Sequence, residues 1–160
     1  MILKQQRDGW CGPAALSFAL LKLGKKVSQE QIAKDLHVGK NGIDPKPLVD
    51  YIKSHGFTAK EFSDKDPKET INVLSGLVKR GHAVLVDYLA GNTNEDGHYV
   101  VFQGKQGNKI LVWDPQYGEN KPLSQDYFIS HWKDFTSHDT MFKNWAVSIS
   151  PKGKPQRTSI

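Results

Sequence analysis

The N-terminal part of the chain repeats apolar residues with the period of an amphipathic helix. Leucines recur at spacings of four and three residues, which predicts a helix over residues 12–24 that ends at Gly24. Ser28 and Gln31 form the sequence pattern of a capping box, and two Asp-Pro pairs begin later helical patterns. These signals predict three more helices, at residues 29–36, 45–55 and 67–80.

Beyond Gly81 the pattern changes to short runs of β-branched and aromatic residues. Four such runs predict strands at residues 82–89, 98–102, 109–113 and 145–149, with an earlier edge strand at 57–62 and a helix at 124–132. Helices first and strands later, joined mostly by short turns, predict an α+β fold with an antiparallel sheet. We expect one domain over residues 1–150, with a helical half at 1–64 and a sheet half at 65–150.

Composition and charge narrow the possible partners. The net charge is +5 and the pI is about 9.2, but Lys and Arg are spread along the chain, which argues against nucleic-acid binding. The basic stretch 151–160 is predicted to be a flexible tail. No apolar run reaches the ~20 residues of a membrane span, and the N-terminus lacks a signal-peptide pattern. We therefore expect a cytoplasmic monomer with no membrane insertion.

Cys11 is the only cysteine, and it stands where the first helical pattern begins. The N-terminus of a helix stabilises a negative charge, so this position favours a nucleophilic thiolate. Gly12 would leave space for a substrate beside the sulfur, and Trp10 would either line a cleft there or cap the core. The alternative role for Cys11 is that of a small buried apolar residue.

Gln5 lies six positions before Cys11, where a side-chain amide can donate a hydrogen bond to a developing oxyanion. Gln5 followed by Cys11-Gly12-Pro13-Ala14-Ala15 resembles the papain-like cysteine peptidases. It is most similar to the family that removes double-glycine leader peptides from bacteriocins, often as the first domain of an ABC exporter. The resemblance implies Gln5 as oxyanion donor and Cys11 as nucleophile, with a His and an Asp farther along the chain.

His98 and Asp114 are the candidates for those two roles. The strands that contain them flank residues 104–108, a plausible hairpin turn. If Gly104 pairs with Asn108, then His98 falls opposite Asp114, where a carboxylate can hold one ring nitrogen and leave the other for Cys11. Exposed strand-end and turn positions are the alternative roles for these two residues.

A competing pair is His82 with Asp87, which lies five residues later along the same predicted strand. An odd spacing puts two side chains on opposite faces of a regular strand, so a direct contact between them requires a bulge.

The resemblance supports His98 and Asp114, because that family has a His at the start of one strand and an Asp-Pro at the end of the next. It covers about residues 3–150 and implies cleavage after small residues such as Gly-Gly. The polar stretch 90–97 would then border the cleft and affect substrate choice, or serve only as a connector. A link to an ABC exporter is implied as well.

Two other functions use the same residues. An acyltransferase would pass the acyl group from Cys11 to an amine instead of water, and a catalytically idle domain of a secretion system would only bind extended peptides. The sequence contains no Cys or His cluster with metal-ligand spacing and no phosphate-binding loop, so no metal or cofactor is expected.

Overall fold

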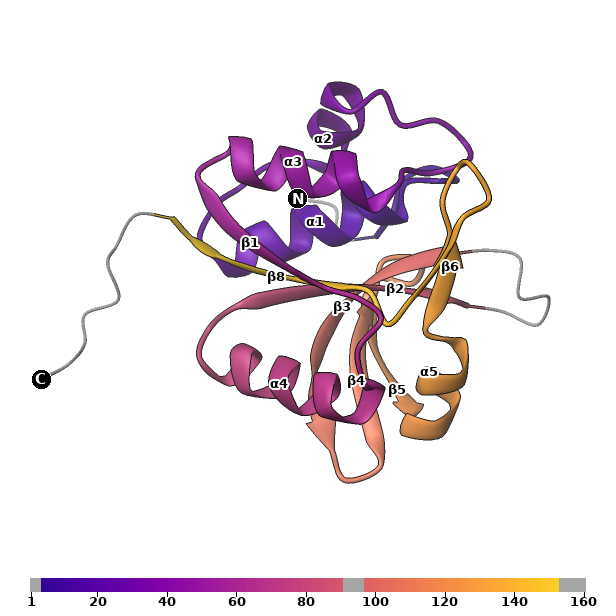
Figure 1. Cartoon of the computed structure of the whole chain (residues 1–160). Coiled ribbons are helices and arrows are strands. Elements are labelled where there is room, and N and C mark those ends of the chain that lie inside the picture. The colour runs from indigo at the N-terminus through magenta and orange to yellow at the C-terminus, as the bar shows by residue number, and fades with distance from the viewer. Residues whose placement is uncertain (1–3, 91–96, 153–160) are drawn as a thin grey trace, which may run out of the picture.

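A six-stranded antiparallel sheet divides the fold into three layers in the computed structural model, which describes residues 4–90 and 97–152 (Figure 1). The first three helices cover one face of the sheet, and the last two cover the other. The predicted α+β class with an antiparallel sheet is confirmed. Because both faces are covered, the central strands are buried on both sides.

Every helix and strand predicted from the sequence occurs, with bounds that differ by a few residues. The helices are α1 (Cys11–Lys22), α2 (Gln29–Asp35), α3 (Pro45–Ser54), α4 (Pro67–Lys79) and α5 (Gln125–His131). The strands are β1 (Phe57–Phe62), β2 (Ala83–Leu89), β3 (Gly97–Gln106), β4 (Lys109–Asp114), β5 (Glu119–Ser124), β6 (Lys133–Phe135), β7 (Met141–Lys143) and β8 (Ala146–Pro151).

The predicted glycine stop of α1 and the predicted serine cap of α2 both form. Gly24 adopts φ +86° after α1, where the amide of Lys25 donates to the carbonyl of Leu20, as in a Schellman motif. Ser28 accepts a hydrogen bond from the amide of Gln31 at 3.1 Å and so caps α2. The reciprocal half of the capping box does not form, because the side chain of Gln31 donates to Asp35 instead.

The alternation of residues along β2 explains how one sheet carries two cores. Leu85 belongs to the core under α1, α2 and α3, whereas Val84 and Val86 belong to the core under α4 and α5. Successive side chains of a strand point to opposite faces, so β2, which is buried along its whole length, contributes side chains to both cores. Trp113, Trp132 and Trp145 are core residues, with 3%, 1% and 4% exposure.

The strand order in the main sheet is β1-β8-β2-β3-β4-β5, and β6 and β7 form a separate hairpin. The sequence did not predict β5, β6 or β7. Strand β5 is an edge strand of mostly polar residues in which only Leu123 is buried, so it has no apolar period to detect. The three-residue strands β6 and β7 are too short to show a period.

The predicted pairing of β3 with β4 is wrong by three residues next to the turn and by two residues beyond a bulge. The hairpin pairs Gln106 with Lys109, and a bulge between Phe102 and Gly104 shifts the register, so that Val101 pairs with Trp113. Continued by one residue, this register places Val100 opposite Asp114. His98 is therefore a diagonal neighbour of Asp114 rather than its direct partner, and it stays on the same face.

Two sequence predictions concern residues that lie outside the described part of the chain. The stretch 90–97 includes residues 91–96, and the basic tail includes residues 153–160. At the described end, β8 finishes at Pro151, and the amide of Lys152 donates to the carbonyl of Gly56.

Candidate active site

Cys11 is the first residue of α1, and the fold leaves its side chain half-buried beside the sheet. Trp10 occupies the cap position and makes no side-chain capping bond. The first amides of a helix have no partner within the helix, and together with the helix dipole they favour negative charge at this end. The prediction that Cys11 begins a helix is confirmed.

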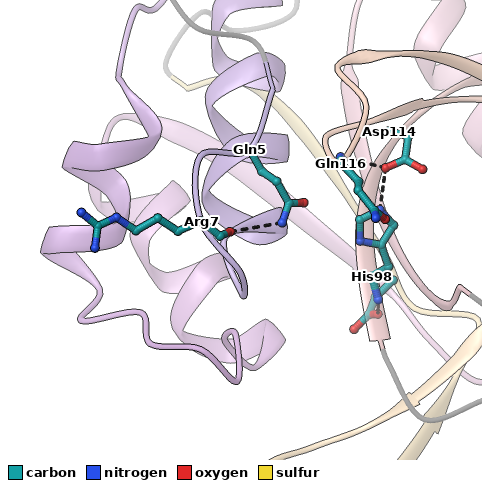
Figure 2. Close-up of polar contacts among 6 residues, drawn as sticks. Gln5, Arg7, His98, Asp114 and Gln116 are labelled. Carbon is teal, nitrogen blue, oxygen red and sulfur yellow. Dashed lines mark hydrogen bonds and ion pairs between the residues drawn. The ribbon is translucent and has the colours of Figure 1, made fainter.

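His98 lies at the start of β3 and is 8% exposed. Its Nε2 atom lies 2.6 Å from Oδ1 of Asp114, the last residue of β4 (Figure 2). The side chain of Cys11 interacts with the same ring, and Nδ1 is the nitrogen that the bond to Asp114 leaves free. Burial by itself lowers the pKa of His98, but the hydrogen bonds to Asp114 and Cys11 outweigh it and raise that pKa to about 9.

Asp114 is held in its charged form by the groups around it. Burial would raise the pKa of this carboxyl, but the hydrogen bond and charge of His98 lower it below its usual value, helped by the amide of Gln116. That amide lies 2.9 Å from Oδ1 of Asp114. The side chain is 2% exposed, so the carboxylate faces His98 and not solvent.

Gln5 reaches the same site from the irregular segment before α1 (Figure 2). Its main-chain amide donates to the carbonyl of Pro115 at 2.7 Å, which ties Gln5 to the end of β4. Its Nε2 donates to the carbonyl of Arg7 at 3.2 Å, and one N–H of the amide remains. Among the described residues its Oε1 is buried and accepts no hydrogen bond from the protein.

Part of this site lines one cleft of about 880 Å³. Gln5, Cys11, His98 and Gln116 lie together in it, and one wall is the loop before α3 while the other is the β6–β7 hairpin. Ser137 of the hairpin donates to Asp44 through its amide at 2.9 Å and its hydroxyl at 2.7 Å, so the two walls are bridged. Asp44 caps no amide of α3 because its carboxylate is used in this bridge.

The expectation that Gly12 leaves space for a substrate beside Cys11 is wrong. A Cβ atom at Gly12 would lie 3.0 Å from Ile43 and 3.3 Å from the ring of Tyr99, so the space over Gly12 is filled by protein and not left for substrate. Trp10 does not line the cleft; the guanidinium of Arg7 lies 5.4 Å from the centre of its ring.

The competing histidine lies apart from the cleft. Nδ1 of His82 is 2.9 Å from the hydroxyl of Ser148, and burial with the charge of Arg80 lowers the pKa of His82. His98 is the one histidine among the described residues that lines the cleft.

Asp87 belongs to the site in a way that the sequence did not predict. Its Oδ1 accepts a hydrogen bond from the main-chain amide of His98 at 3.2 Å. The carboxyl group of Asp87 also interacts with the carboxyl group of Asp134. Burial, followed by the hydrogen bond and charge of Asp134, raises the pKa of Asp87 well above its usual value. Asp134 packs directly on Gly97, where no side chain would fit.

Asp87→Asn is expected to stabilise the protein at neutral and alkaline pH. The raised pKa means that the folded chain holds a proton that the unfolded chain releases, so this contribution is present below pH 3.8 and is lost as pH rises through the folded-state pKa. Asparagine keeps the acceptor for His98 without that proton. Urea unfolding between pH 4 and 8 should show a gain that grows with pH. A constant difference, or the same trend in the exposed control Asp50→Asn, would contradict the assignment.

None of the helices within 4–90 and 97–152 is long and apolar enough to cross a membrane. In the same ranges, no three His, Cys, Asp or Glu side chains are grouped so that they could hold a metal ion.

Solved structures with this fold include the peptidase domain of Streptococcus ComA, a bi-functional ABC transporter involved in quorum sensing. It is 21% identical with a TM-score of 0.73, and the match covers 93% of this chain and 96% of that one. A double glycine motif protease from an AMS/PCAT transporter, solved with its leader peptide, is 19% identical with a TM-score of 0.67 and coverages of 95% and 91%.

The peptidase C39 like domain of a toxin secretion ATP-binding protein from Vibrio parahaemolyticus is 14% identical with a TM-score of 0.58, and the match covers 92% of this chain and 100% of that one. No curated protein matches the sequence. The sequence pattern of the Peptidase C39 family matches residues 1–137, which is most of the chain. The fold is thus the papain-like fold of those peptidase domains, as the resemblance implied, and the chain belongs to the peptidase C39 family.

Proposed function

We propose that this chain is a cysteine peptidase with Cys11 as nucleophile, His98 as acid and base, Asp114 as the group that orients His98, and Gln5 as oxyanion donor. The observation that carries the proposal is that Cys11, at a helix N-terminus, lines the same cleft as His98, whose ring is hydrogen-bonded to Asp114. One domain over residues 1–150 would hold all four groups.

The reaction follows from the positions of these groups. Sγ of Cys11 bonds to the carbonyl carbon of the scissile peptide, and the C–N bond breaks as His98 gives its proton to the leaving amine. Water then attacks the thioester while His98 accepts its proton, and the sulfur leaves. In both steps the oxyanion receives hydrogen bonds from the amide of Cys11 and from the side chain of Gln5.

The proposed substrate is a peptide with small residues, Gly-Gly above all, before the cut. The Asp44–Ser137 bridge joins the two cleft walls, which favours an extended peptide segment with small side chains between them. The solved relative with a leader peptide is a double glycine motif protease. The same comparison supports an ABC exporter as partner and a cytoplasmic location for this chain.

A peptide library read by mass spectrometry tests both levels of the proposal. We expect cleavage with glycine preferred at both positions before the cut, and none in Cys11→Ala. A bulky apolar residue preferred two positions before the cut would overturn the substrate, and cleavage no faster than in Cys11→Ala would overturn the peptidase. A parallel incubation with a primary amine distinguishes acyl transfer, which yields an amide product in place of the acid.

The alkaline limb of kcat/KM is expected near pH 9 and should move toward 6.5 in Asp114→Asn. His98 must carry a proton to protonate the leaving amine, and that proton is lost as pH rises through about 9. Removing the carboxylate removes the leading cause that raises this pKa. The activity at the optimum should fall, but less than in Cys11→Ala.

The matched control for this experiment is Asp139→Asn, which neutralises another carboxyl that lines the cleft. Its alkaline limb should match that of the unmodified chain. Equal limbs in Asp114→Asn and the unmodified chain would mean that Asp114 does not set the protonation of His98.

A further inference from the structure

The side chain of Gln29 forms hydrogen bonds with the main chain of the residues immediately before and after Gln5. It is the first residue of α2 and is 3% exposed. Its Oε1 accepts a hydrogen bond from the main-chain amide of Gln6 at 2.9 Å, and its Nε2 donates to the carbonyl of Lys4 at 2.8 Å. The two bonded main-chain groups immediately flank Gln5.

The two hydrogen bonds from Gln29 fix the main chain of residues 4–10, which has no neighbouring strand to pair with. Residues 4–10 form neither helix nor strand, so no ladder of main-chain bonds fixes their position. A carboxamide carries the same donor and acceptor as a peptide unit, and Gln29 therefore pairs with this segment as one residue of a neighbouring strand would. The bond from the amide of Gln5 to Pro115 holds the segment on its other side.

We propose that Gln29 is a positioning residue that holds Gln5 where its side chain reaches the oxyanion. The inference rests on the proposed function, because it gives Gln5 a role that the reaction requires. An oxyanion donor acts only within about 2.7–3.1 Å of the charged oxygen, and a shift of about 1 Å in such a group lowers the rate by about 10²-fold. Gln29 itself does not line the cleft, so it acts through Gln5.

A double-mutant cycle on the best library peptide tests this coupling. Gln29→Ala is expected to lower kcat by about 10- to 100-fold with little change in KM, since the lost interaction is made in the transition state. In the Gln5→Ala background the same substitution should change kcat less than about 2-fold, because the group that it positions is already gone.

Two further variants separate positioning from folding. Gln29→Glu keeps an acceptor for Gln6 but replaces the donor to Lys4 with an oxygen, so it should also lower kcat. Gln31 lies two residues after Gln29 in α2, and its side chain is exposed, so Gln31→Ala should leave kcat unchanged. Thermal unfolding followed by circular dichroism reports whether each variant is folded.

The outcomes are distinct. A folded Gln29→Ala with normal kcat, or an equal loss of kcat in both backgrounds, overturns the role of Gln29 while the peptidase stands. If neither Gln29 variant folds, Gln29 supports the fold as a whole, and the positioning role is likewise overturned. An unmodified chain that cleaves no peptide refutes the proposed function itself.

Discussion

Replacing Cys11 with alanine is expected to abolish turnover, with a loss on the order of 10⁶-fold in kcat, because no other group in the cleft can form the thioester. The side chain is small and half-buried, so the fold should persist. His98→Ala should give a loss of similar size, because the thiol then has no base and the leaving amine has no acid. Hydrolysis of a cleavable peptide, with circular dichroism for folding, measures both effects.

His82→Ala is the matched control for the histidine. The ring of His82 is hydrogen-bonded to Ser148, and neither residue lines the cleft, so His82→Ala should keep nearly full activity. An inactive His82→Ala with an active His98→Ala would show that the wrong histidine has been assigned. His98→Ala should also melt at a lower temperature, because it leaves the carboxylate of Asp114 buried without its partner.

Gln5→Ala is expected to lower kcat by about 10²–10³-fold, the loss that follows removal of one oxyanion donor. The amide N–H of Cys11 would remain, so some activity should persist. KM should change little, because the hydrogen bond is strongest to the charged oxygen of the transition state. Steady-state kinetics on a single good substrate separate the two parameters.

Gln6→Ala is the control for this substitution. It removes the adjacent carboxamide but keeps the main-chain amide that donates to Gln29. Nearly unchanged kinetics are expected. If Gln6→Ala and Gln5→Ala lose activity equally, the effect comes from the segment and not from an oxyanion donor at Gln5.

The sequence was sufficient for the regular elements and for the chemistry of single residues. Apolar periods, glycine stops and Asp or Ser caps are local signals, so they predicted the five helices of the described chain and five of its strands. The lone cysteine at a helix start and the motif around it pointed to the family, which the match over residues 1–137 shows. The polar edge strand β5 carried no such signal.

The register of strand pairing could not be predicted from the local sequence pattern. The hairpin between β3 and β4 is three residues out of the predicted register, which alone would put His98 and Asp114 on opposite faces. The bulge between Phe102 and Gly104, where Gly104 has φ +134°, shifts the register of the two strands by one residue. This shift returns His98 and Asp114 to the same face of the sheet. The expected contact therefore occurs through a different geometry.

The sequence by itself determined the five helices and five strands of the described chain, the α+β class and the family. Only the tertiary structure decided which groups support the site, including the carboxyl pair of Asp87 and Asp134 behind His98 and the hold of Gln29 on both sides of Gln5. The reason is physical: periods and caps act over a few neighbouring residues, whereas these contacts join segments 11 to 47 positions apart and form only when the layers pack.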